Sequence, residues 1–480
     1  MTSPIARADR ALGQTVEKVV TSHHRRRLRR AGWERAAAAP PGWWAEGDPA
    51  PRPGNAFELL VDGAEALEAI AAGIRSARSQ IHLAGWQLNP GFAVSRRDTP
   101  VTVRELLAEA ASRIDVRVLL WAGAPLPLFR PSRADVKKGR DALCEGTPIR
   151  CALDARERPM HCHHEKTIVI DDRLAFVGGI DLTDFAGDRY DSNAHPFRGS
   201  VGWHDAAARL EGPAVRDVAE HFRMRWQAVT GELLPASLSP AVAGSVEVQV
   251  VRTVPDHMYP QRPAGDFRVL EIYLRALRAA SRFIYLENQF LWSPEVLAVL
   301  RDKLRRPPSS DFRLLVVLPA KPNSGGDDTR GQLGTLMQAD DGAGRLLACT
   351  IYARGPDRDS PVYVHAKVGI VDDRWLTVGS ANLNEHSLFN DTEMNLAITD
   401  GPTVTRVRRR LWSEHLERPV GDLERDPVEV IDRLWKPIAH EQAERRRRGD
   451  RPTHRLTLLP GVSKSWGLLL GPIQGLLIDA

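Results

Sequence analysis

One short motif occurs twice in the chain, at a constant separation. The first copy is His164-Glu-Lys166-Thr-Ile-Val-Ile-Asp171, and six residues then lead to Gly178-Gly179. The second is His365-Ala-Lys367-Val-Gly-Ile-Val-Asp372, and six residues lead to Gly379-Ser380. Matched positions are displaced equally, since 365 − 164 and 372 − 171 both give 201. A repeat period near 200 residues indicates a duplicated domain rather than a solenoid.

The similarity between the two halves extends beyond the motif. Residues 77–88 parallel residues 279–291, and in each segment a helix-like pattern leads into a short β-type run. Each half also contains a strand rich in branched residues, at 116–120 and 312–318. Because helices and strands alternate, we expect an α/β sandwich in each half. The expected division is a basic helical arm with a Pro/Gly linker, two similar domains, and a charged helical tail with an apolar terminus, over residues 1–54, 55–235, 245–420 and 421–480.

Composition limits the possible partners and location. The chain has 480 residues, of which 42% are apolar, and its net charge of +5 favours anionic partners such as phosphate groups, acidic membranes or nucleic acid. Arginine runs at 25–30 and 445–448 predict either solvated helix faces or contact with anionic headgroups. The amino terminus lacks a signal-peptide pattern, and no apolar stretch approaches the ~20 residues that span a bilayer. We therefore expect a cytoplasmic monomer that contacts the membrane peripherally. Residues 466–479 form the nearest apolar candidate and are expected to pack against the protein.

The repeated motif predicts a β-hairpin that presents a histidine and a lysine together. Residues two apart on a strand share a face, so His164 and Lys166 should project together, as should His365 and Lys367. Asp171 and Asp372 lie an odd number of residues from these side chains, so we assign both aspartates to structural hydrogen bonds near the turn. The paired small residues after each hairpin, which include Gly179 and Ser380, permit the close backbone approach that a bound phosphate would use.

Two imidazoles and two ammonium groups suit phosphoryl transfer. The reference pKa of imidazole is near 6.5, so one copy can be neutral and attack phosphorus while the other is protonated and gives its proton to the departing oxygen. The two lysines would neutralise the equatorial phosphate oxygens. Each histidine also needs a carboxylate on its other ring nitrogen, and Asp205 and Glu393 are the candidates that follow the two motifs.

The sequence indicates neither a metal nor a cofactor. Its four cysteines form no C-x-x-C pair. The run His161-Cys-His-His164 cannot converge on one ion if it is a strand, because consecutive side chains point to opposite faces. The loop-like segment 321–330 could border the site, but it lacks the pattern of a nucleotide-binding P-loop.

These motifs resemble those of the phospholipase D superfamily, whose H-x-K-x4-D-x6-G-[GS] motif is present twice. The resemblance covers most of residues 55–420 and includes the Trp-His-Asp at 203–205, the Glu-Asn-Gln-Phe at 287–290 and Gly379-Ser-Ala-Asn382. It implies two similar α/β domains about a pseudo-twofold axis, one active site at their interface, a phosphohistidine intermediate and no metal. It further implies that His164 is the nucleophile and His365 the general acid. Asn382 would bind a phosphate oxygen with Gly179 and Ser380, whereas Asp181, at the position matching Asn382, is assigned a structural contact.

The expected function is that of a phospholipase D. Such an enzyme would cleave the distal phosphodiester of a glycerophospholipid, or would transfer the phosphatidyl group to an alcohol. Cardiolipin synthesis by the same transfer is the first alternative, and a nucleic-acid phosphodiesterase is the second. No aromatic-and-basic binding module requires a nucleic acid, so none is expected as a partner. A catalytically silent binding protein is a third reading, and the presence of both histidines and both lysines argues against it.

Overall fold

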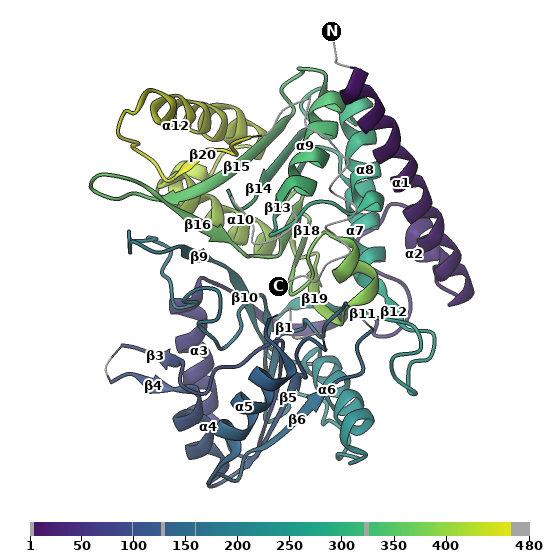
Figure 1. The fold of residues 1–480 in the computed structure, drawn as a ribbon, viewed down its shortest axis with the longest axis vertical. Coiled ribbons are helices and arrows are strands. Elements are labelled where there is room, and N and C mark those ends of the chain that lie inside the picture. Colours follow the sequence, from purple (N-terminus) through teal and green to yellow (C-terminus); the bar gives the residue numbers. More distant parts are fainter. Residues whose placement is uncertain (1–3, 98, 126–129, 159, 321–325, 462–480) are drawn as a thin grey trace.

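The structure, a computed structural model, describes residues 4–461 apart from 98, 126–129, 159 and 321–325. The apolar segment 466–479 and the first part of the loop 321–330 lie outside the described residues. Figure 1 shows two α/β halves, with the elements of the first half below those of the second. This mixed α/β architecture confirms the predicted fold class; the domain boundaries stay predictions.

The first half is built on one mixed sheet of seven strands. The strand order is β6 (Arg150–Asp154), β5 (Asp115–Trp121), β2 (Gln80–Gly85), β7 (Thr167–Ile170), β8 (Leu174–Gly178), β10 (Ala206–Glu211) and β1 (Arg52–Val61). The β6–β5 and β5–β2 pairs are parallel, and the other neighbouring pairs are antiparallel.

The second half repeats this order and this pattern of pairings. Its strands are β15 (Leu346–Ala353), β14 (Arg313–Val317), β13 (Phe283–Glu287), β17 (Val368–Val371), β18 (Trp375–Gly379), β19 (Glu393–Ile398) and β11 (Val246–Val254). β1 pairs with β11, and β9 (Gly202–His204) pairs with β16 (Ser360–Val364), so main-chain hydrogen bonds between these strands join the two halves.

Helices cover both faces of each sheet. Leu83 packs with α3 and α4, whereas the next residue, Ala84, packs with Phe222 of α6 on the opposite face. In the second half Ile284 packs with α7, α8 and α9, and Tyr285 packs with α10 and η3. The helices are α3 (Gly63–Ser76), α4 (Val103–Ala111), α5 (Arg133–Cys144), α6 (Val215–Thr230), α7 (Arg268–Ala279), α8 (Pro294–Arg305), α9 (Gly326–Asp340), α10 (Gly401–Leu416) and the π-helical segment η3 (Ile431–Trp435).

The two predicted hairpins form and turn at paired aspartates. Asp171 and Asp172 have φ angles of 54° and 51°, and their counterparts Asp372 and Asp373 have the same values. Two successive positive φ angles characterise the type I′ turn of a two-residue hairpin, which aspartate tolerates better than most residues. The first aspartate of each pair accepts hydrogen bonds from the backbone entering the neighbouring strand, at Ser79 and Gln80 for Asp171 and at Ser281 and Phe283 for Asp372. The hairpins are thereby attached to β2 and β13.

The segments at both ends of the chain pack mainly on the second half. In Figure 1 the purple helix α1 (Pro4–Arg30) lies beside α8, and α2 (Glu34–Ala38) contacts α7. The buried Arg27 donates to Asp256 and to the carbonyl of Phe389. Near the other end, α12 (Lys436–Arg448) leads to β20 (Leu456–Leu458), which extends the sheet beside β15. Within the described residues, no helix is both long and apolar enough to cross a membrane.

Candidate active site

Both motif histidines lie just outside the strands on which the sequence placed them. His164 and Lys166 precede β7, and His365 and Lys367 occupy the connection between β16 and β17. The backbone gives the reason. The N–H of His164 donates to the carbonyl of Thr392 at 3.0 Å, and that of His365 donates to the carbonyl of His204 at 2.7 Å. Each histidine is therefore bonded to the other half of the molecule.

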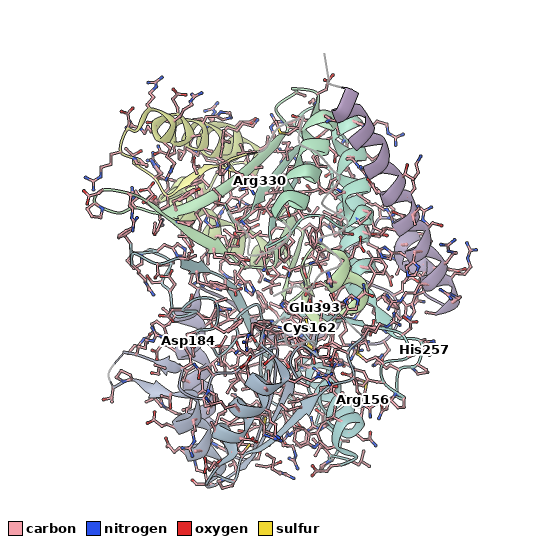
Figure 2. The ribbon with its side chains drawn as sticks, in the orientation of Figure 1. Arg156, Cys162, Asp184, His257, Arg330 and Glu393 are labelled. Atoms are coloured by element: carbon pink, nitrogen blue, oxygen red, sulfur yellow. The ribbon has the colours of Figure 1, made fainter. Side chains whose placement is uncertain are left out.

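The side chains of the two histidines are also held across the interface. His164 Nδ1 lies 2.9 Å from Glu393 Oε1, at the start of β19 in the second half. His365 Nδ1 lies 2.6 Å from Asp205 Oδ2, between β9 and β10 in the first half. Figure 2 shows Glu393 and Cys162 at the junction between the halves. The sequence named both carboxylates without pairing them with histidines; the structure pairs each histidine with the carboxylate of the opposite half.

The two carboxylates differ in their surroundings. Burial raises the pKa of Glu393 to about 8, although Lys166 and the hydroxyls of Ser380 and Ser387 favour its ionised form. Burial would also raise the pKa of Asp205, but His365 and Lys367 outweigh it and lower the pKa to about 2. Since Lys367 acts on both carboxylates, the two histidine–carboxylate pairs belong to one electrostatic unit.

The two lysines are buried and oriented by neighbouring polar groups. Lys166 Nζ donates to the carbonyl of His164 at 2.8 Å and lies 3.2 Å from Asp181 Oδ2. Lys367 Nζ donates to the carbonyl of His365 and lies 3.2 Å from Gln289 Oε1. The two halves thus differ here, because a carboxylate faces the first ammonium group and an amide oxygen faces the second.

The residues predicted to bind phosphate lie beside these groups. Asn382 Nδ2 is 3.3 Å from Gln289 Oε1, next to Lys367. Ser380 donates to Glu393, and a side chain at Gly179 would collide with the carboxylate of Asp205. Gly179 therefore leaves room for the carboxylate of Asp205, and Ser380 bonds the carboxylate of Glu393. A contact of any of the three with a substrate phosphate stays a prediction.

Arg189 is a buried cation of the site whose importance the sequence did not indicate. Its side chain is 3% exposed, and its guanidinium carbon lies 3.6 Å from the ring centre of Trp203. The same indole stacks on Tyr363 and lies 5.1 Å from the ring of His365. Arg189 lies in the connection between β8 and β9, and a lone arginine in a loop carries no periodic signal that would have predicted its place.

The protonation of His365 is set by its surroundings. Burial, together with Lys367, lowers its pKa well below the ordinary value, and Arg189 acts in the same direction. Asp205 opposes this shift. His365 is therefore neutral in the resting protein at neutral pH, and Asp205 is placed to stabilise the imidazolium when it takes a proton.

Comparison with known proteins agrees with this geometry. A family model described as "Cardiolipin synthase, PLD-like domain" matches residues 273–414. "Phospholipase D A" of Dictyostelium discoideum is 26% identical over 462 residues, which cover 75% of this chain and 35% of that protein. "Phospholipase D2" of Bos taurus is 26% identical over 82% of this chain and 56% of its own length. The chain thus spans between a third and about half of these two relatives.

A solved structure shares the fold. The phosphatidylserine synthase of Haemophilus influenzae superposes with a TM-score of 0.51 at 14% sequence identity. The superposition covers 82% of this chain and 93% of the synthase. At this identity the likeness concerns the fold alone.

Proposed function

Since the chain belongs to the phospholipase D superfamily, we propose that it is a phospholipase D-type phosphodiesterase acting on glycerophospholipids. The observation that carries the proposal is the crossed arrangement of two histidines, each bonded through Nδ1 to a carboxylate of the opposite half. This bond leaves the Nε2 atom of each imidazole as the one that would face a substrate. Related proteins named as phospholipases D support the choice of substrate class.

In the proposed reaction His164 is the nucleophile. The protonated form of His365 is the one that reacts. The Nε2 of His164 attacks the phosphorus atom, the bond from phosphorus to the headgroup oxygen breaks, and His365 gives that oxygen its proton and becomes neutral. The phosphatidyl group is then attached to His164. In the second step His365 removes a proton from water or an alcohol, whose oxygen attacks phosphorus and displaces His164. Phosphatidate or a phosphatidyl alcohol leaves, and both histidines return to their starting state.

The other residues of the site have supporting roles in this proposal. Lys166 and Lys367 offset the charge on the phosphate oxygens, and Asn382 donates a hydrogen bond to one of them. Glu393 and Asp205 fix the tautomers of their histidines, and the ionised Asp205 stabilises the imidazolium form of His365. No step of this chemistry requires a cofactor.

Cardiolipin synthesis is the second candidate, because the family model that matches residues 273–414 is described by that activity. The same phosphatidyl-histidine would then react with the hydroxyl group of phosphatidylglycerol. For either activity we propose a cytoplasmic monomer that contacts anionic membrane peripherally. The exposed Arg25, Arg26, Arg29 and Arg30 of α1 support this contact, with each surface charge contributing about 1 kcal/mol.

A headgroup-release assay on liposomes of defined composition tests the proposal. We expect release of the headgroup alcohol, formation of phosphatidylethanol when ethanol is added, and no effect of a chelator on either. The His164→Ala variant should lose both activities. Cardiolipin formation from phosphatidylglycerol, with no release of choline or ethanolamine, would support the second candidate. Activity confined to DNA or RNA would refute the proposal.

A further inference from the structure

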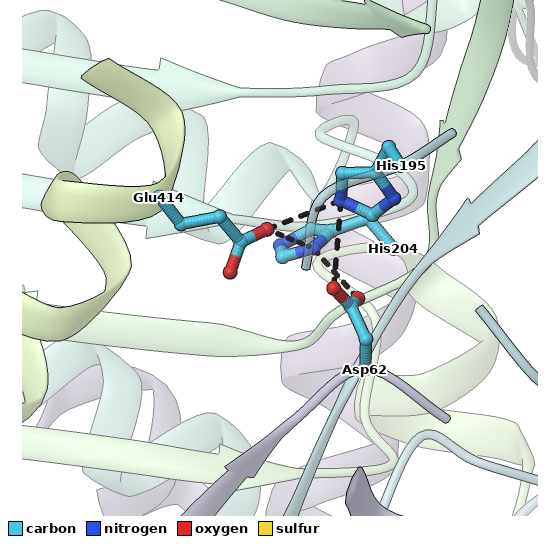
Figure 3. A group of neighbouring side chains, drawn as sticks. All are labelled: Asp62, His195, His204 and Glu414. Atoms are coloured by element: carbon cyan, nitrogen blue, oxygen red, sulfur yellow. Dashed lines mark hydrogen bonds and ion pairs between the residues drawn. The ribbon is translucent and has the colours of Figure 1, made fainter. Parts of the chain in front are cut away.

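Four buried side chains converge at His204, whose carbonyl oxygen bonds the backbone of His365, and none of the four is used by the proposed reaction. Asp62 follows β1, His195 lies in the segment before β9, His204 belongs to β9, and Glu414 belongs to α10 of the second half. Figure 3 shows their polar atoms facing one another. Asp62 and His204 are fully buried and His195 is 2% exposed. The cluster therefore has little contact with solvent.

The distances within the cluster fit four ligands around one ion. His204 Nδ1 lies 2.9 Å from Asp62 Oδ1 and 3.3 Å from Glu414 Oε1. His195 Nε2 lies 3.1 Å from the same Glu414 oxygen and 3.5 Å from Asp62 Oδ2. A tetrahedral zinc ion with bonds of about 2.0–2.1 Å separates its ligand atoms by about 3.3 Å. The four separations between a histidine nitrogen and a carboxylate oxygen are close to this value; Asp62 faces His204 with Oδ1 and His195 with Oδ2.

A second shell of carboxylates surrounds the two histidines. His204 Nε2 lies 3.0 Å from Glu287 Oε2, and His195 Nδ1 lies 3.4 Å from Asp191 Oδ2. A histidine that binds a metal through one nitrogen usually donates its other N–H to such a group. Both carboxylates thus favour the tautomers that direct His204 Nδ1 and His195 Nε2 into the cluster.

One atom of the cluster has no hydrogen-bond partner. Asp62 Oδ2 is buried and accepts no hydrogen bond, although it faces His195 Nε2. A buried carboxylate oxygen without a donor is unfavourable, and coordination to a cation would satisfy it. This observation is independent of the spacing of the four ligand atoms.

We propose that Asp62, His195, His204 and Glu414 bind one zinc ion. Two neutral imidazoles and two carboxylates form a neutral complex with a divalent cation, and a four-coordinate set containing imidazole favours zinc over calcium or magnesium. All four positions are taken by protein, so the ion is structural. This inference does not rest on the proposed function.

The proposed ion would stabilise the segment that positions the general acid. His204 precedes Asp205, and its carbonyl oxygen accepts hydrogen bonds from the backbone of His365 and Ala366. Glu414 comes from α10 of the second half, so the ion would also connect the two halves. Because the ligands are buried, zinc would enter while the chain folds.

Metal analysis of the full-length protein tests the proposal. The protein is refolded with zinc or with a chelator, freed of unbound metal and assayed by mass spectrometry for zinc. We expect about one zinc per chain after refolding with zinc, and a higher melting temperature than for the chelator-treated protein. Refolding with cobalt(II) should give the intense visible absorption of four-coordinate cobalt.

Isosteric variants locate the ion. Asp62→Asn and Glu414→Gln should lower zinc affinity more than tenfold, and Glu287→Gln, which alters only the second shell, should lower it about 10- to 100-fold. The matched control is His221→Gln, because His221 is a buried histidine bonded to Glu165 outside the cluster. This control should retain its zinc.

Three results would overturn the proposal. The first is that the wild-type protein takes up no zinc during refolding and gains no stability from it. This result would show that imidazole protons alone hold the cluster together. Another is zinc retained at full affinity by both ligand variants. The third is a six-coordinate cobalt spectrum of the wild-type protein, which decides the question even if the variants do not fold.

Discussion

The protonation of His365 should control the pH dependence of the first reaction step. A general acid must carry its proton, and burial with Lys367 lowers the pKa of His365 well below its ordinary value. The donor form therefore becomes scarcer as the pH rises, so kcat/KM should fall by up to tenfold per pH unit above that pKa. Measurements with a short-chain soluble phospholipid between about pH 4.5 and 8 would check this. A kcat/KM that shows no fall towards the alkaline end of this range would contradict the role of His365 as general acid.

The crossed carboxylates yield a second prediction for single residues. Both Asp205→Asn and Glu393→Gln keep the shape of the side chain. Asp205→Asn removes the charge that stabilises the imidazolium form of His365, and Glu393→Gln removes the carboxyl group that orients His164, so kcat should fall about 10²- to 10⁴-fold. KM should change little, because neither carboxylate is expected to contact the substrate. The matched control is Asp184→Asn, since Asp184 bonds Asn89 at the periphery (Figure 2) and should retain wild-type kcat. A loss below tenfold in either carboxylate variant would contradict the assignment.

At the scale of secondary-structure elements, helix α6 holds the first motif in place. Glu165, between His164 and Lys166, is buried and accepts hydrogen bonds from His221 and Arg225 of this helix. Arg225 also pairs with Asp154 of β6 at 2.8 Å. Replacing Arg225 by Met would leave two buried carboxylates without their cation, so the free energy of unfolding should fall by about 3–5 kcal/mol.

Urea unfolding measures this effect, and the same helix offers a control. Arg216 is half-exposed and lies 3.8 Å from Glu220, so Arg216→Met should change the free energy by less than about 1 kcal/mol. Equal effects of the two substitutions would show that α6 does not anchor the motif through Arg225.

The sequence predicted the elements better than it predicted the contacts between them. The hairpins could be predicted because two short apolar runs joined by an Asp-Asp turn are local signals. The sequence could not show which carboxylate bonds which histidine. Glu393 and His164 are 229 positions apart, and spacing along one strand gives no information about the opposite half. For the same reason the sequence placed His164 on a strand, whereas its N–H bonds to the carbonyl of Thr392. The convergence of Asp62, His195 and Glu414 on His204 also gave no local signal.

At the scale of the whole molecule, two sheets with the same strand order meet so that each half supplies the carboxylate that bonds the histidine of the other. Pairing of β1 with β11 and of β9 with β16 fixes the halves against each other. Main-chain bonds from His164 to Thr392 and from His365 to His204 then bring each histidine to the other half's carboxylate. In the proposed mechanism, His164 and His365 must therefore act on the same phosphodiester, and one of them forms a covalent bond to its phosphorus atom.

A covalent bond between His164 and phosphorus can be trapped. A single turnover of a phospholipid labelled at phosphorus is stopped in the His365→Ala variant, and the protein is digested and analysed by mass spectrometry. We expect a phosphatidyl group attached to His164, and we expect no such adduct when His164 is replaced by Gln. Headgroup release by the wild-type protein without a covalent adduct on either histidine would contradict the proposed mechanism.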